Sequence, residues 1–206
     1  MLKFIKLFLC VTGGYFIGSL SPSALLGKIK KVDLRKTGTG NLGATNVFLS
    51  LGKLHGFIVM LLDMAKAFIA VKLSQLLCND IQFAGIAAGS LAVLGHIFPF
   101  YMRFKGGKGL APYAGMVLAL DPWLFLMLLI VCTAAMIIAN YSVAMPFSAA
   151  VLFPLLSIHR EHHIAYFVIA VLISSVIIYK HFGNFIKALK GEDIKKRDYI
   201  RSIKKS

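Results

Sequence analysis

The sequence predicts an all-α integral membrane protein, a polytopic bundle of about seven transmembrane helices. Hydrophobic residues make up 58% of the 206 residues, charged residues only 15%, and the mean hydropathy is +0.79. A water-soluble domain carries about 25% charged and 45–50% apolar residues, because its surface has to be polar. No segment alternates with the period of a strand, and helices satisfy their own backbone hydrogen bonds in lipid. We interpret residues 1–206 as a single membrane domain.

Seven apolar segments account for the predicted spans, and two of them are short. They are residues 4–27, 54–78, 81–100, 109–120, 122–140, 142–157 and 164–180. An upright helix needs about 20 apolar residues to cross a bilayer, so the fourth and sixth segments are expected to be tilted, partial or re-entrant. A five-span model omits these two. Pro122 after Asp121, and the stretch from Asn140 to Ser142, are expected to break the helices.

The distribution of basic residues predicts the orientation in the membrane. The chain has 23 Lys and Arg against 8 Asp and Glu, a net charge of +15. If the N-terminus lies outside, residues 28–53, residues 101–108 and the tail from Lys180 face the cytoplasm and hold eighteen of these basic residues. This asymmetry is typical of cytoplasmic loops near anionic lipids, and it does not indicate nucleic acid on a membrane chain. Omitting both short spans leaves the orientation unchanged.

Two glycine-rich stretches predict anion binding on the cytoplasmic side. The loop from Asp33 to Asn46 contains Gly38, Gly40 and Gly43, which match G-x-G-x-x-G without the strand that a dinucleotide fold requires. Glycines without a Cβ let backbone N–H groups approach a phosphate, and we favour this over a flexible connector. The second stretch runs from Lys105 to Gly109 and opens the fourth apolar segment, where helix-terminal N–H groups and a lysine form an anion site. It lacks the spacing of an ATP-binding P-loop.

Three further features concern side chains inside or beside the apolar segments. His96 ends the third segment beside the second glycine stretch, where it is either a functional residue or a polar tip at the interface. Asp63 and Lys66 lie three residues apart, so they share a helix face and are expected to form a structural ion pair. Cys10, Cys78 and Cys132 lack metal-ligand spacing and are expected to be small buried hydrophobic residues.

Several common catalytic patterns are absent from the sequence. No His precedes an Asp at H-x4-D spacing, no G-x-S-x-G elbow exists, and no metal ligands share a helix at useful spacing. No nucleophile–base pair is evident. The remaining cationic glycine loops suit a reaction that depends on positioning and charge stabilisation of an already activated substrate.

In these motifs the chain resembles the bacterial acyl-phosphate:glycerol-3-phosphate acyltransferases of the PlsY type. The resemblance covers nearly the whole chain: Gly18-Ser19, Asp33-Leu34-Arg35, Gly38 to Val47, Gly52-Lys53, Asp63 with Lys66, Gly95-His96 with Pro99, Phe104 to Gly109, and His181 with Asn184. It implies a seven-helix enzyme of the bacterial inner membrane with its active site on the cytoplasmic side. The enzyme would transfer a fatty acyl group from acyl phosphate, not acyl-CoA, to sn-glycerol 3-phosphate, giving lysophosphatidic acid and phosphate for phospholipid synthesis. No cofactor, metal or protein general base is implied; the partners are the two substrates and membrane lipids.

The resemblance also implies roles for individual residues. The implied catalytic residues are Thr39, Asn41, His96, Lys108, His181 and Asn184. The implied substrate- and phosphate-binding residues are Arg35, Gly38, Gly40, Gly43, Asn46, Lys105, Gly106, Gly107, Gly109 and Ser142, with Glu192 or Asp193 in place of a late family Glu. The chain departs from the family by having Leu49 and Asn140 where the family has arginines. A non-catalytic relative is therefore one alternative. A membrane phospho-anion transporter is the other, because charged helix ends near the membrane would also serve it.

Overall fold

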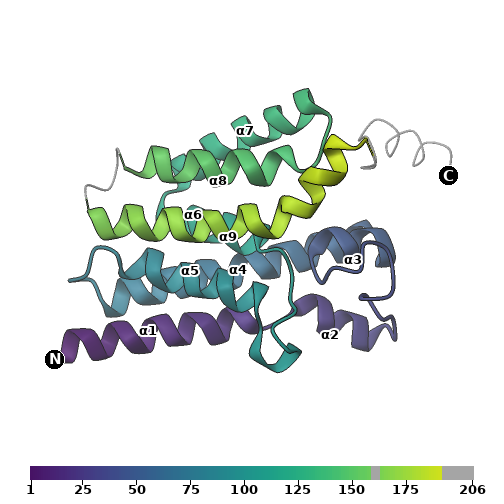
Figure 1. Cartoon of the computed structure of the whole chain (residues 1–206). Helices are drawn as coiled ribbons and strands as arrows, with labels where there is room; N and C mark the ends of the chain where they lie inside the picture. Colours follow the sequence, from purple (N-terminus) through teal and green to yellow (C-terminus); the bar gives the residue numbers. More distant parts are fainter. Residues whose placement is uncertain (159–162, 192–206) are drawn as a thin grey trace.

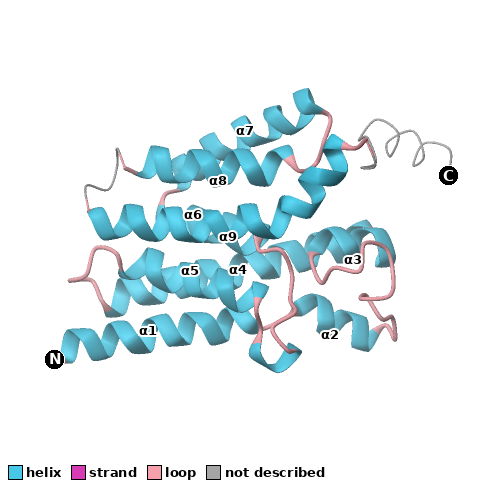
Figure 2. Cartoon of the chain, in the orientation of Figure 1, coloured by secondary structure: helices cyan, strands magenta, loops and turns pink. Residues whose placement is uncertain are grey.

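The computed structural model describes residues 1–158 and 163–191, and in that part of the chain it contains helices and no strand (Figure 2). The all-helical class is therefore as the sequence predicts. The helices of the described residues are α1 (Leu2–Ser19), α2 (Pro22–Ile29), α3 (Ala44–Leu51), α4 (Lys53–Leu77), α5 (Ala84–Ile97), α6 (Leu110–Leu120), α7 (Pro122–Ala139), α8 (Ala144–Ser157) and α9 (Ile164–Leu189), with a 3-10 turn, η1 (Phe100–Met102).

The helices lie side by side in layers, with α1 at one edge and α7 and α8 at the other (Figure 1). Helix α1 packs on α5, α4 packs on α5 and α6, and α8 packs on α9. In the described residues, five segments are long and apolar enough to cross a membrane: Leu2–Ile29, Lys53–Leu77, Ala84–Met102, Pro122–Ala139 and Ile164–Leu189. Helices α6 and α8 are shorter, as expected for the fourth and sixth apolar segments.

The first apolar segment is not the single helix over residues 4–27 that the sequence predicts. Helix α1 ends at Ser19, and α2 begins at Pro22 after an extended residue. Ser21 caps α2 by accepting a hydrogen bond from the Ala24 amide, and Pro22 has no N–H to donate back into α1. The expected loop over residues 28–53 also contains a helix, α3. By contrast, the predicted break at Asp121 is confirmed, because its carboxylate caps the start of α7.

Glycines on α1 allow close contact with α5. A Cβ added at Gly18 would overlap the backbone of Ala92, and one added at Gly14 would meet the carbonyl of Ala88. In a membrane, helices associate through such close packing, because lipid supplies no hydrophobic drive between them. The close approach places the C-terminal end of α1 beside the C-terminal end of α5.

Hydrogen bonds from two tyrosines hold these helix ends together. Tyr15 on α1 donates its hydroxyl proton to the Phe98 carbonyl at 2.7 Å. Tyr101 of η1 donates to the Ser19 carbonyl at 2.8 Å. Both acceptors are helix-terminal carbonyls without a partner inside their helix. The break between α1 and α2 is therefore fixed against the segment that follows α5.

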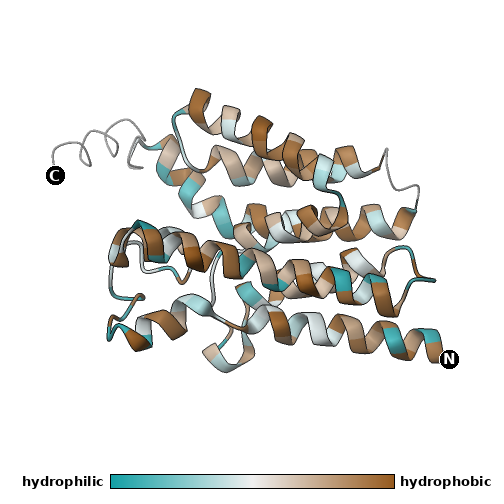
Figure 3. Ribbon diagram, turned by 180° about the vertical axis from the view of Figure 1, so that it is seen from behind, coloured by the Kyte–Doolittle hydropathy of each residue, from teal (hydrophilic) through white to brown (hydrophobic). Residues whose placement is uncertain are grey.

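Two apolar clusters hold the bundle and the first glycine loop. The larger cluster joins helices α4 to α9, with Tyr113 and Phe153 in edge contact at 5.5 Å between ring centroids. The smaller cluster places Leu34 and Leu42 of the loop against Val47 and Val59 of α3 and α4. Hydrophilic residues gather at the end of the bundle where α2, α3 and the end of α9 lie (Figure 3). The apolar side chains of the smaller cluster thus hold the first glycine loop against α3 and α4.

Candidate active site

The second glycine stretch folds back on the end of α5. The Gly106 amide donates to the Ile97 carbonyl at 3.0 Å, and the Gly107 amide donates to the His96 carbonyl at 3.1 Å. These two N–H groups are therefore already paired, so the expectation that they hold phosphate does not fit the structure. Their glycines have another requirement: a Cβ at Gly106 would overlap the His96 carbonyl, and one at Gly107 would overlap the His96 ring.

Gly109 turns the chain into α6. Its φ of +88° lies in the left-handed region, where glycine is favoured over other residues. The first backbone N–H groups of any helix have no partner within it, so the start of α6 carries a partial positive charge. Lys108 precedes this start directly. The anion site predicted at the helix terminus therefore retains a lysine and the α6 dipole, without the Gly106 and Gly107 amides.

Lys108 reaches across to the last third of α9. Its Nζ donates to Asn184 Oδ1 at 2.7 Å, which uses one of the three N–H groups of the ammonium. His181 lies one turn before Asn184 on the same helix face and is 6% exposed. Its Nδ1 donates to the Ile177 carbonyl at 2.9 Å, so Nε2 is the acceptor nitrogen of the neutral ring. The structure thus brings together Lys108, His181 and Asn184, which the sequence predicts as site residues.

Asn46 organises the first glycine loop from within. Its Nδ2 donates to the Leu34 carbonyl and its Oδ1 accepts from the Thr39 amide, both at 2.7 Å, and the side chain is fully buried. A Cβ at Gly38 would overlap that Oδ1, and Gly38 has a φ of +56°. Asn46 and Gly38 therefore shape the loop. The buried side chain of Asn46 does not lie on the surface where contact with substrate was expected, whereas Gly38 is exposed and its expected contact with substrate stays a prediction.

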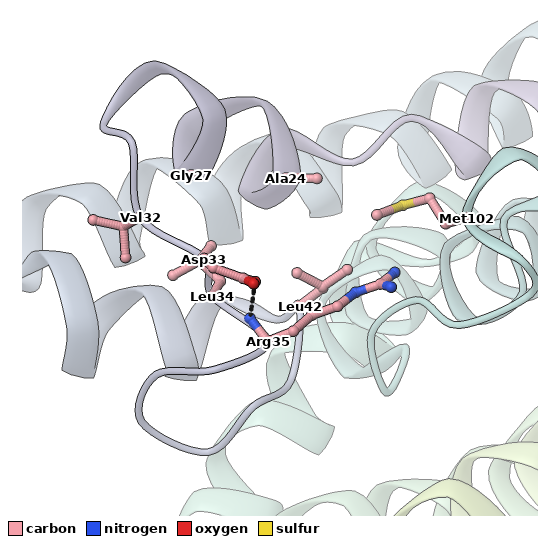
Figure 4. Close-up of a pocket in the computed structure, with 8 residues that line it drawn as sticks. All are labelled: Ala24, Gly27, Val32, Asp33, Leu34, Arg35, Leu42 and Met102. Atoms are coloured by element: carbon pink, nitrogen blue, oxygen red, sulfur yellow. Dashed lines mark hydrogen bonds between the residues drawn. The ribbon is translucent and has the colours of Figure 1, made fainter.

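The two glycine stretches meet through Arg35. Its Nη2 donates to the Lys105 carbonyl at 2.9 Å, although the two residues are 70 positions apart. Arg35 and Lys105 are both exposed, as are Thr39 and Gly40, while Asn41 and Gly43 are half-buried. A pocket of about 140 Å³ opens beside Arg35, with Asp33 at its rim and apolar side chains of α2, the loop and Met102 around it (Figure 4). Arg35 and Lys105 thus add positive charge on one side of the glycine stretch.

A buried polar group lies beneath the second glycine stretch. Lys66 Nζ is 2.8 Å from Asp63 Oδ1, which confirms the ion pair expected from their spacing. The same Nζ is 2.8 Å from His96 Nδ1 and 2.8 Å from the Leu20 carbonyl oxygen. Sequence reasoning missed this connection between Lys66 and His96, because it depends on the relative position of α4 and α5, for which the sequence carries no local signal.

The other predicted residues lie farther from these contacts. Ser142 is exposed in the turn between α7 and α8, at the same end of the bundle as the end of α9 (Figure 1). Leu49 is 43% exposed on α3, and Asn140 ends α7 with a φ of +61°. Glu192 and Asp193 lie outside the described residues. Within the described chain, His, Cys, Asp and Glu side chains form no group of three arranged to hold a metal ion.

Chemically, the arrangement is a cationic site at the end of a short helix. Lys108, Arg35 and Lys105 supply positive charge, and His96, His181 and Asn184 supply hydrogen-bonding groups within or beside the same loops. Such a site binds an oxyanion and stabilises negative charge that develops during group transfer. The residues that carry it come from distant parts of the chain, which only the helix packing brings together.

Comparisons with known proteins agree with this arrangement. A family model described as glycerol-3-phosphate acyltransferase matches residues 8–191. A glycerol-3-phosphate acyltransferase of Desulforamulus reducens is 38% identical over 187 residues, covering 90% of this chain and 92% of the relative. One of Prochlorococcus marinus subsp. pastoris is 39% identical over 199 residues, covering 92% of this chain and 97% of the relative.

The fold is also similar to solved structures. Crystal structures of PlsY, described as an integral membrane glycerol 3-phosphate acyltransferase, match in a glycerol 3-phosphate form and a lysophosphatidic acid form. The TM-scores are 0.85 and 0.83, the identities 32% and 30%, and each match covers 92% of this chain and 94% of the other. The chain therefore belongs to the glycerol-3-phosphate acyltransferase family and is an integral membrane protein of the PlsY type.

Proposed function

We propose that this protein transfers a fatty acyl group from acyl phosphate to sn-glycerol 3-phosphate, giving 1-acyl-glycerol 3-phosphate and inorganic phosphate in phospholipid synthesis. The observation that carries the proposal is the contact of Lys108 with Asn184 at the start of α6, next to Arg35 and Lys105. These cations suit two phosphorylated substrates. Family membership along nearly the whole chain supports the same reaction.

The reaction needs positioning more than a protein nucleophile. A hydroxyl oxygen of glycerol 3-phosphate attacks the carbonyl carbon of acyl phosphate, forming the new ester bond. The bond from that carbon to the phosphate oxygen breaks, and the departing phosphate accepts the hydroxyl proton. Lys108 holds a phosphate group, and the positive end of α6 stabilises the negative charge that grows on the leaving group. Thr39, Asn41 and His181 are proposed to orient the substrates.

We further propose seven membrane crossings, with the N-terminus outside and the site at the cytoplasmic face of the bacterial inner membrane. The loops around Lys36 and Lys105 and the end of α9 share the basic end of the bundle, as the positive-inside rule requires. The opposite end carries Lys3, which pairs with Asp80 at 2.8 Å. The short helices α6 and α8 are then the fourth and sixth crossings.

The donor assay is the direct test of the proposed reaction. Purified protein with glycerol 3-phosphate should release inorganic phosphate and form 1-acyl-glycerol 3-phosphate from acyl phosphate, and should form none from acyl-CoA. Omitting glycerol 3-phosphate controls for hydrolysis of the donor. If neither donor supports transfer, the proposal fails. Uptake of labelled glycerol 3-phosphate into proteoliposomes would then identify a transporter. Absence of both transfer and uptake would identify a non-catalytic relative.

Lys108→Ala should reduce kcat/KM for glycerol 3-phosphate by a factor of at least about 10 to 100. A hydrogen bond to a charged group contributes about 1.5–3 kcal/mol, and about 1.4 kcal/mol corresponds to a factor of ten in rate. Lys187→Ala is the matched control, because it removes an exposed lysine from the last turn of α9. Equal kinetics for the two variants would show that Lys108 does not bind substrate.

Single-cysteine labelling should establish the orientation. In a variant with the three native cysteines replaced by serine, Lys36→Cys should resist a membrane-impermeant maleimide on intact cells and react after the cells are opened. Asn79→Cys, exposed at the opposite end after α4, should react on intact cells. The reverse pattern would contradict both the orientation and a cytoplasmic site.

A further inference from the structure

Lys66 is surrounded by acceptors for all of its protons. The side chain is 6% exposed, and its Nζ lies 2.8 Å from each of three atoms: Asp63 Oδ1, His96 Nδ1 and the Leu20 carbonyl oxygen. An ammonium group has three N–H donors and no acceptor. The buried lysine therefore has three close partners: an ion pair with Asp63, and hydrogen bonds to His96 Nδ1 and the Leu20 carbonyl.

These contacts determine which nitrogen of His96 carries the proton. The N–N distance of 2.8 Å between Lys66 and Nδ1 is a hydrogen bond only if Nδ1 accepts, because two N–H groups at that distance repel each other. Nδ1 is also 3.2 Å from Asp63 Oδ1, but the contact with Lys66 Nζ is shorter at 2.8 Å, so we assign the role of Nδ1 from the contact with Lys66. The neutral ring of His96 is thus protonated on Nε2.

The protonated nitrogen faces the second glycine stretch. A Cβ on Gly107 would overlap Nε2, so this atom lies directly against the loop that leads to Lys108. In the described part of the chain, the structure gives Nε2 no hydrogen-bond partner, although the ring is only 7% exposed. An N–H donor on a largely buried ring, without a protein hydrogen-bond partner and next to a cationic site, is suited to a ligand oxygen.

We propose that Lys66 is a positioning residue for catalysis: it fixes His96 as the tautomer that offers an Nε2–H donor to an oxygen of the phosphorylated substrate. The proposal rests on the proposed function for the identity of that substrate. Asp63 balances the charge of Lys66, so the donor is presented by a neutral ring. The Leu20 carbonyl, at the break between α1 and α2, belongs to the same network. The position of the Nε2–H donor therefore depends on α4, on α5 and on this break.

The test compares Lys66→Met with Lys72→Met, which removes an exposed lysine from the same helix. Protein labelled with ¹⁵N-histidine, in detergent micelles, reports the tautomer of each ring; His96→Gln assigns its signal. The wild type and Lys72→Met should show His96 protonated on Nε2. In Lys66→Met, protonation should shift toward Nδ1, which can then donate to Asp63. Protonation on Nδ1 in the wild type, or no shift in Lys66→Met, would overturn the proposal.

Kinetics separate positioning from simple stability. Lys66→Met should lower kcat/KM about tenfold, the cost of one misplaced hydrogen bond. In a His96→Ala background the same substitution should cost less than about twofold, because the group that it positions is gone. Equal losses in both backgrounds would indicate a structural role and contradict the proposal.

A second variant covers the case in which Lys66→Met leaves Asp63 unpaired and prevents folding. Asp63→Leu with Lys66→Met removes both buried charges together and leaves no donor for Nδ1, and its thermal unfolding is compared with that of the wild type. It should again lose the fixed Nε2–H tautomer; retention of that tautomer would refute the role of Lys66. Because the tautomer is measured without substrate, its dependence on Lys66 is tested independently of the acyl-transfer reaction.

Discussion

The buried ammonium of Lys66 is the constraint on which the rest of the site depends. Its three protons need three acceptors in a place that water does not reach, and they find them on α4, on α5 and at the end of α1. The break after Ser19 makes the Leu20 carbonyl available to Lys66. The close packing of Gly14 and Gly18 against α5 brings this carbonyl near the lysine. The middle of α4 is thereby joined to the ends of α1 and α5, and the second glycine stretch folds back on the end of α5.

The glycines of the second stretch allow close packing, whereas their motif indicates anion binding by their amides. Gly106 and Gly107 pack the loop onto the His96 backbone and ring, and their amides are used in that packing. In the proposed function, the phosphate is bound instead by side-chain cations and by the start of α6. Arg35 of the first loop contacts the second glycine stretch, which carries Lys105 and Lys108, and this gathering of basic residues agrees with a reaction that needs charge stabilisation and no protein base.

Features that depend on local spacing were predictable from the sequence. The membrane class followed from composition, the helix break at Asp121 from the proline after it, and the Asp63–Lys66 pair from a separation of three residues. The break at Leu20 was not recognised, because apolar residues continue on both sides of it. The inward-facing amide of Asn46 and the contact of Lys66 with His96 depend on tertiary packing, so no local pattern records them. The same holds for the contact between Lys108 and Asn184.

An experimental structure of the protein with glycerol 3-phosphate bound would test the central claim most directly. The account predicts phosphate oxygens within about 3 Å of Lys108 Nζ, the distance of a charge-assisted hydrogen bond. The phosphate should lie on the side of the loop where Arg35 and His96 are also within reach. A glycerol 3-phosphate molecule bound away from Lys108, for example at the opposite end near Lys3 and Asp80, would contradict it.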